Sequence, residues 1–201
     1  MSRVRTRPTR KDTRERLFEA AAKIFEGSGI GDGSIESIAS AAGLSRGAVY
    51  SNFASKDELI IAMLEDHAER SLEHHRELLA RHREPADLIA ALRSAERSRK
   101  DPIGRSPLFH MELILFVARA EKRRPELAKR LRARRALIAE IVAAVNRTAG
   151  RKLPVDPVWA GSLLVALEDG FRLHRLVDPD TTPADGFFHA VSELQRLLAR
   201  A

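Results

Sequence analysis

The chain contains no cysteine, one tryptophan and one tyrosine, and aromatic residues make up only 5% of its 201 residues. The absence of cysteine excludes disulfide bonds, thiolate catalysis and cysteine-ligated zinc or iron–sulfur sites. No stretch approaches the ~18 uninterrupted apolar residues of a membrane span, and the basic start MSRVRTRPTRK lacks the apolar core of a secretory signal. Together these absences predict a soluble cytoplasmic protein.

Positive charge is abundant. The net charge is +7 and the pI is about 10.3, which favours a polyanionic partner. Residues 1–12 carry five basic side chains and little apolar content, so we interpret them as a flexible basic arm. Contact with a DNA minor groove and a solvated tail are both open interpretations of this arm.

The most informative segment runs from Ile35 to Lys56. Ser34 stands where a helix N-cap is expected, Gly43 is suited to a sharp turn, and Ser45 provides a second N-cap. The helix that follows is too short to be stable alone and must be held by packing through Val49. Its other side is small and polar, which suits close approach to base edges in a major groove. The pattern predicts a helix-turn-helix that reads DNA.

Apolar residues at three- and four-residue spacing predict further helices and no strands. We expect the first helix to begin at Thr13 and to end at Gly27-Ser28-Gly29. The later helices are expected at about 46–52, 55–83, 86–98, 107–121, 125–149, 157–176 and 183–199, with a loop around 99–106. The predicted fold is all-α, with about nine helices. It has an amino-terminal three-helix domain and a larger carboxy-terminal helical domain.

Residues 13–66 resemble the amino-terminal domain of the TetR family of bacterial transcriptional regulators. The shared residues are Arg14, Ala21, Ala22, Phe25, Gly29, the Ser34-Ile35 and Ile38-Ala39 pairs, the Ala42-Gly43-Leu44-Ser45 turn, Gly47, Tyr50, Phe53, Lys56 and Leu59. The chain departs from the family pattern at Asn52, where many members carry histidine, and in the glycine-rich loop before Ser34. The resemblance implies a flexible arm at 1–12, a DNA-binding domain at 13–60 and a ligand-binding and dimerisation domain at 61–201.

The same resemblance implies a homodimer on a palindromic DNA operator. Tyr50 and Lys56 match positions that contact phosphates, and Ser45, Arg46 and Gly47 match positions that face bases. Arg46 can pair with guanine or with a phosphate, and both readings are open. The predicted DNA-binding residues are Ser34, Ser45, Arg46, Gly47, Tyr50, Asn52 and Lys56.

The helix at 107–121 is apolar on nearly every side, which is typical of a central helix that lines a pocket. Its polar side chains are either paired within the fold or turned toward a ligand. The predicted ligand-binding residues are Phe109, His110, Leu113, Phe116, Glu168 and Phe171. By analogy with the family, the last two helices form the dimer interface, for which we expect Trp159, Leu163, Leu167, Phe188, Val191 and Leu194. Because no cluster of several basic groups marks an anion site, the expected ligand is a small, largely apolar molecule.

Other readings are weaker. GSGIGDG at 27–33 lacks the dinucleotide-binding spacing, and the spacing of the histidines between His67 and His82 does not suit a metal, so we expect neither cofactor nor metal. No nucleophile motif is present, so an enzyme is not expected. The basic run at 122–135 is interpreted as a solvated helix face rather than a second nucleic-acid surface.

The sequence predicts a transcriptional repressor that a ligand releases from its operator. The alternative is a DNA-binding architectural or assembly factor whose carboxy-terminal domain only dimerises.

Overall fold

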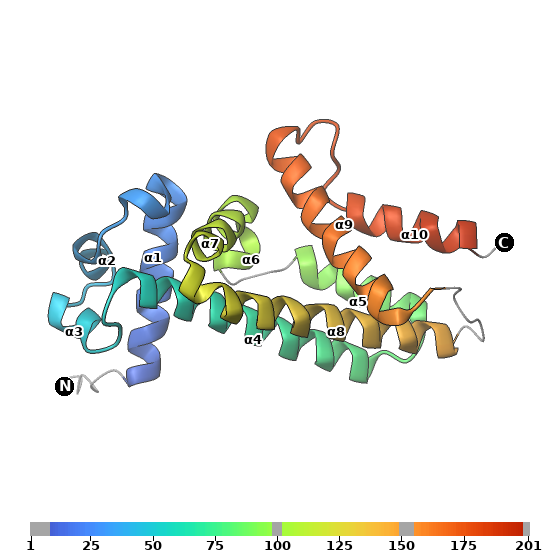
Figure 1. Ribbon diagram of the computed structural model, residues 1–201, viewed down its shortest axis with the longest axis horizontal. Helices are drawn as coiled ribbons and strands as arrows, with labels where there is room; N and C mark the ends of the chain where they lie inside the picture. The colour runs from blue at the N-terminus through green and yellow to red at the C-terminus, as the bar shows by residue number, and fades with distance from the viewer. Residues whose placement is uncertain (1–8, 98–101, 149–154, 199–201) are drawn as a thin grey trace, which may run out of the picture. The chain divides into compact units, whose positions relative to one another are not determined.

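A computed structural model describes residues 9–97, 102–148 and 155–198. These residues form helices and no strand, which confirms the all-α prediction with about nine helices (Figure 1). The described residues contain ten α-helical segments, of which α6 is a single turn. Their bounds are α1 Arg10–Asp32, α2 Ile35–Ala41, α3 Arg46–Tyr50, α4 Lys56–Arg81, α5 Pro85–Arg97, α6 Pro102–Arg105, α7 Pro107–Arg119, the 3-10 helix η1 Glu121–Arg123, α8 Arg124–Thr148, α9 Pro157–Val177 and α10 Gly186–Leu198.

The chain divides into two compact units. Unit 1 combines residues 1–66 with 101–116, and unit 2 combines residues 67–100 with 117–201. Unit 1 therefore contains α1 to α3, the start of α4 and most of α7. The division of the chain at residue 60 stays a prediction, and residues 1–8 of the basic arm lie outside the described residues.

Aromatic side chains join the helices of unit 1. The rings of Phe18 on α1 and Phe53, after α3, lie 5.8 Å apart, and the rings of Phe25 on α1 and Phe109 on α7 are also 5.8 Å apart. Such aromatic pairs stabilise a core beyond the area that they bury. Both α3 and α7 are therefore anchored to the same long helix, α1.

The start of α1 differs from the prediction. The helix begins at Arg10, because Thr9 and Asp12 form a capping box in which each side chain accepts the other residue's backbone N–H. The range to Asp32 joins two helical segments that meet at Gly29, whose φ of +80° and ψ of 162° are not helical, so the long segment ends at the predicted Gly27-Ser28-Gly29 breaker. Hydrogen bonds from Lys56 and Glu112 hold the short turn that follows.

Two carboxy-terminal expectations also need correction. Residues Pro102–Arg105 form the short helix α6 within the predicted loop, part of which lies outside the described residues. The last helix begins at Gly186 rather than at Pro183. A turn precedes it, closed by a hydrogen bond of 3.0 Å from Gly186 N–H to Pro183 O. Proline here serves the turn and not the first helical position.

In unit 2, the most extensive helix–helix contact is between α8 and α9, which lie across one another in Figure 1. A smaller core of Leu78, Leu88, Leu137 and Ile141 joins α4, α5 and α8. At Gly161 the two backbones of α8 and α9 approach closely, since an added Cβ would lie 2.6 Å from Arg135 O. In the part of the chain that the structure describes, no helix combines the length and the apolarity that crossing a bilayer requires.

Replacing Gly161 by alanine should therefore force α8 and α9 apart and lower the free energy of unfolding by about 1–3 kcal/mol, the usual range for overpacking. Gly170 on the same helix is the control, because an added Cβ there meets no atom within 4 Å. Gly170→Ala should be neutral or stabilising by up to about 1 kcal/mol. Urea unfolding at one protein concentration measures both, and equal stability of the two variants would contradict the close approach.

Candidate nucleic-acid interface

Serine caps begin both helices of the predicted DNA-reading segment. Ser34 Oγ accepts the Ser37 N–H at 3.1 Å ahead of α2, and Ser45 Oγ accepts the Ala48 N–H at 3.1 Å ahead of α3. Each cap satisfies a backbone donor that a helix N-terminus leaves without a partner. The hydroxyls predicted to face DNA thus also fix where the two helices start.

The turn between α2 and α3 is closed by backbone and side-chain contacts. Gly43 adopts a φ of +63°, a conformation that glycine accepts without strain. Leu44 N–H donates to Ala39 O at 2.9 Å, and Arg16 on α1 donates from Nη2 to Ala42 O at 2.5 Å. The angle between α2 and α3 is therefore fixed both by the turn and by Arg16 of α1.

Helix α3 has a buried side and an exposed side. Val49 is fully buried and Phe53 is 1% exposed, as their predicted core role requires. Tyr50 is 47% exposed, and Ser45, Arg46 and Gly47 are exposed as well. The structure thus gathers the predicted base-facing and phosphate-facing residues of α3 on its solvent side.

Two of the predicted DNA-binding side chains already have partners within the module. Arg46 Nη2 lies 2.6 Å from Glu36 Oε1 on α2, and both side chains stay more than half exposed. Asn52 donates from Nδ2 to Ala48 O at 2.8 Å, while its Oδ1 is buried and accepts no hydrogen bond within the described residues. The Asn52 amide is thus turned toward its own helix.

Lys56 caps the end of α1, a role that the sequence analysis did not predict. Its Nζ donates to three backbone oxygens at the end of α1: Ile30 O at 2.8 Å, Gly31 O at 3.0 Å and Gly33 O at 2.7 Å. From the other side, Glu112 Oε2 on α7 accepts the Ile30 N–H at 3.3 Å. All three ammonium donors are therefore used, and a phosphate contact by this side chain stays a prediction with a competing role.

Two capped helices joined by a glycine turn, the second short and exposed on its polar side, define a helix-turn-helix protein. The family model for bacterial regulatory proteins of the tetR family matches residues 17–63, and the model for the tetracyclin repressor-like C-terminal domain matches residues 83–201. The chain belongs to the TetR family. The expectation that it is not an enzyme agrees with this family, whose models describe regulatory proteins.

Relatives and solved structures extend this finding. The HTH-type transcriptional regulator TtgW of Pseudomonas putida is 43% identical over 54 residues, which are 27% of this chain and 40% of that protein. The next curated relatives are likewise matched over less than half of their length, 25% and 38%.

Among solved structures, reduced NemR of Escherichia coli has a TM-score of 0.73 at 21% identity, covering 90% of this chain and 97% of that one. The SmeT–triclosan complex has a TM-score of 0.66 at 23% identity, covering 85% and 83%. SmeT is the repressor of a Stenotrophomonas maltophilia multidrug efflux pump. At these identities the structures show a shared fold.

The predicted ligand-binding residues fall into both units. Phe109 and Leu113 are buried in unit 1, where Phe109 packs on α1, and His110 is 9% exposed. Phe116 is half-buried. Glu168 and Phe171 belong to unit 2, and the Phe171 ring packs so closely on Gly186 that an added Cβ there would lie 2.8 Å from it. The six residues are therefore divided between the two units, four in unit 1 and two in unit 2.

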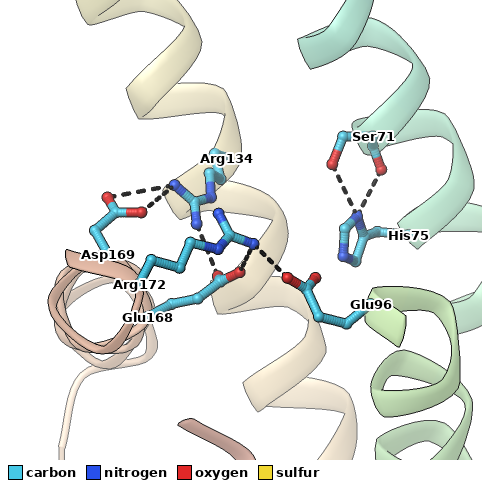
Figure 2. Close-up of polar contacts among 7 residues, drawn as sticks. All are labelled: Ser71, His75, Glu96, Arg134, Glu168, Asp169 and Arg172. Atoms are coloured by element: carbon cyan, nitrogen blue, oxygen red, sulfur yellow. Dashed lines mark hydrogen bonds and ion pairs between the residues drawn. The ribbon is translucent and has the colours of Figure 1, made fainter. Parts of the chain in front are cut away.

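Glu168 lies at the centre of an ion network between α5, α8 and α9 (Figure 2). Its Oε2 lies 2.7 Å from Arg134 Nη2, and its Oε1 lies 2.5 Å from Arg172 Nη2. Arg134 also contacts Asp169 at 3.1 Å, and Arg172 contacts Glu96 at 2.8 Å. Sequence reasoning placed Glu168 toward a ligand, whereas both of its oxygens bind arginine here.

The charges in this network control the pKa of each arginine. Burial lowers the pKa of Arg134, but the negative charges of Glu168 and Asp169 raise it by more, so the pKa lies above its ordinary value. Burial lowers the pKa of Arg172 too, and Glu168 and Glu96 again outweigh that effect. Both guanidinium groups therefore carry their positive charge at neutral pH.

The predicted dimer-interface residues on α9 and α10 are either exposed or half-buried. Trp159 is 58% and Leu163 is 43% exposed, while Leu167, Phe188 and Val191 are half-buried and Leu194 is 40% exposed. Leu173 and Val177, which the prediction did not include, are exposed too. Spacings of four, ten and four residues place Trp159, Leu163, Leu173 and Val177 on one side of α9, and we call this set the α9 stripe.

Sequence reasoning missed the partners of these side chains. Glu36, Arg16 and Glu112 carried no motif, and their partners lie 10, 26 and 82 residues away in sequence. Opposite charges in the first turns of two successive helices were the only available signal for the contact of Glu36 with Arg46.

Among the residues that the structure describes, no group of three or more histidine or acidic side chains is placed to hold a metal ion.

Lys56→Met should remove three hydrogen bonds from the end of α1 and lower the free energy of unfolding by about 2 kcal/mol, because hydrogen bonds to a charged group contribute more than neutral ones. Lys23→Met, at an exposed position of α1, should leave stability unchanged. Chemical denaturation measures both variants. If Lys56 acted only on phosphates, its replacement would weaken DNA binding and leave the unfolding midpoint where it was.

Glu168→Gln should lower the free energy of unfolding by about 3 kcal/mol, since it leaves two largely buried guanidinium groups without their shared counter-charge. Glu193→Gln removes an exposed ion pair with Arg196 on α10 and should change stability by less than about 1 kcal/mol. Thermal or denaturant unfolding distinguishes the two. A Glu168→Gln variant as stable as the control would show that the network contributes nothing to the fold.

Proposed function

We propose that this protein is a sequence-specific DNA-binding transcriptional regulator. The observation that carries the proposal is the exposed side of α3, where Arg46, Gly47 and Tyr50 face solvent on a helix whose start and preceding turn are fixed by hydrogen bonds. A fixed helix whose exposed side chains are small and polar fits into a major groove about 12 Å wide. Membership of the TetR family supports the same function.

Within this function, the predicted residues divide by task. In this proposal Tyr50, which is 47% exposed, binds a phosphate through its hydroxyl, and Arg46 pairs with guanine O6 and N7. Lys56 acts by holding the turn from Ile30 to Gly33 and therefore the start of α2. Phosphate contacts set affinity for any sequence, whereas Arg46 sets the choice of sequence.

The protein acts as a homodimer in this proposal. The α9 stripe leaves four large apolar side chains in water, including Trp159 and Val177, and burying them against a second copy is favourable. A two-fold dimer that places its α3 helices about 34–36 Å apart meets two half-sites on one face of B-DNA. The operator is then palindromic.

We further propose that the protein is a repressor that a small, largely apolar ligand releases from DNA. Support comes from the similarity to SmeT, which is a repressor and was solved with triclosan. A ligand that prefers a dimer with misplaced α3 helices by about 1–3 kcal/mol lowers operator affinity some 5–150-fold.

One observation favours a second candidate, a DNA-binding assembly factor without a ligand. Phe109 and Leu113 are buried in the core of unit 1, and Glu168 is bound by two arginines, so these predicted ligand contacts already serve the fold. A carboxy-terminal domain that only dimerises needs no pocket.

Selection of bound duplexes from a random pool at near-physiological salt tests the proposal. The wild-type chain should enrich a palindrome, and Arg46→Ala should lose about 1–3 kcal/mol of discrimination at one position of each half-site. Tyr50→Phe should weaken binding to all sequences about equally.

Recovery of no preferred sequence by the wild-type chain would contradict sequence-specific regulation and favour the assembly factor. An enriched site without two-fold symmetry would instead contradict the dimer. An unchanged preference in Arg46→Ala would remove Arg46 from base recognition.

A further inference from the structure

Glu36 presents an unexpected charge on the DNA-reading module. It is the only acidic residue of α2, its side chain is 51% exposed, and it lies one helix away from the residues proposed to meet a polyanion. A carboxylate at such a surface opposes DNA binding unless a cation neutralises it. The structure supplies that cation, because Arg46 Nη2 lies 2.6 Å from Glu36 Oε1.

The backbone under both side chains is fixed. Glu36 is the second residue of α2, whose start is held by a reciprocal pair of hydrogen bonds between Ser34 and Ser37. Arg46 is the first residue of α3, whose start is held by Ser45. The ion pair therefore bridges two anchored points, and it limits the positions that the long Arg46 side chain takes.

We propose that Glu36 is a specificity-determining residue that positions Arg46 for one base pair of the operator. The inference rests on the proposed function. A guanidinium group has five N–H donors, and the contact with Glu36 through Nη2 leaves further N–H donors, including the second one on Nη2, to meet guanine. Holding a flexible side chain in its bound conformation reduces the entropy lost on binding the correct base.

The pair also changes what Arg46 contributes to non-specific binding. Paired with Glu36, Arg46 adds no net charge to the surface, so it releases few counterions when the module meets DNA of any sequence. Discrimination is thereby separated from general affinity. Removal of the carboxylate frees a cation that then binds any nearby phosphate.

Glu36→Gln should therefore have two opposite effects. Binding to non-operator DNA should become tighter, with a slope of log affinity against log salt that is steeper by about 0.9 per subunit. The base preference at the position read by Arg46 should fall about tenfold. Selection from a random pool, followed by salt titrations on the enriched site and on unrelated DNA, measures both.

Two further variants separate positioning from simple charge effects. Glu36→Asp keeps the charge and its favourable place at a helix N-terminus but is one methylene shorter, so it should lose the base preference while the salt slope stays close to wild type. Asp57→Asn removes an exposed negative charge at the start of α4 and should leave the base preference unchanged.

The outcomes are distinct. If wild type selects a palindrome while Glu36→Gln and Glu36→Asp keep its base preference at every position, Glu36 does not determine specificity and the inference is overturned. If wild type selects no sequence at all, the proposed function itself fails. If Asp57→Asn relaxes the preference as much as Glu36→Gln does, the effect is one of net charge, which also overturns the inference.

Discussion

The contact between the Lys56 ammonium group and the end of α1 is the constraint on which the DNA-reading module depends. Because the helical backbone is interrupted at Gly29, the carbonyl groups at the end of α1 have no partner within the helix itself. Lys56 satisfies the carbonyls of Ile30, Gly31 and Gly33 with one side chain. The start of α4 is thereby tied to the segment that leads into α2. The glycine-rich loop, which by composition alone suggests looseness, is held from two helices at once.

Unit 2 is organised differently. Its helices meet at a largely buried set of five charged side chains, three acidic and two basic, with Glu168 in the middle. Removing such groups from water offsets much of their attraction, so the network adds little net stability compared with apolar packing. We interpret it as a device that selects one pairing of helix faces, because a shifted α9 would leave charges buried without partners. The amphipathic pattern of α8 and α9 allows several such pairings.

Local signals in the sequence predicted most of the helices and the whole reading segment. Ser34, Gly43 and Ser45 each act on neighbours within a few residues, which is why their roles are visible in sequence. The errors have a common origin in distant contacts. The short helical turn after Gly29 was not predicted, because Lys56 and Glu112, which stabilise it, are distant in sequence.

The predicted ligand set shows the same limit. A helix that is apolar all round, such as α7, tells nothing about which neighbour covers each side, so Phe109 was assigned to a pocket although Phe25 packs on it. Likewise, the acidic character of Glu168 was visible, but the arginines that bind it lie on α8 and one turn further along α9.

The close approach of α8 and α9 at Gly161 restricts the relative motion of the two helices as well as the residue at this position. Sliding α9 along α8 by one turn would bring Leu164 or Val165, which are larger, into a gap that holds no methyl group. Rotation of α9 about Gly161 keeps the glycine in contact with the α8 backbone and is therefore compatible with this packing. Sixteen residues of helix separate Gly161 from Val177, a lever arm of about 24 Å, so a turn of roughly 5° displaces the far end of the α9 stripe by about 2 Å.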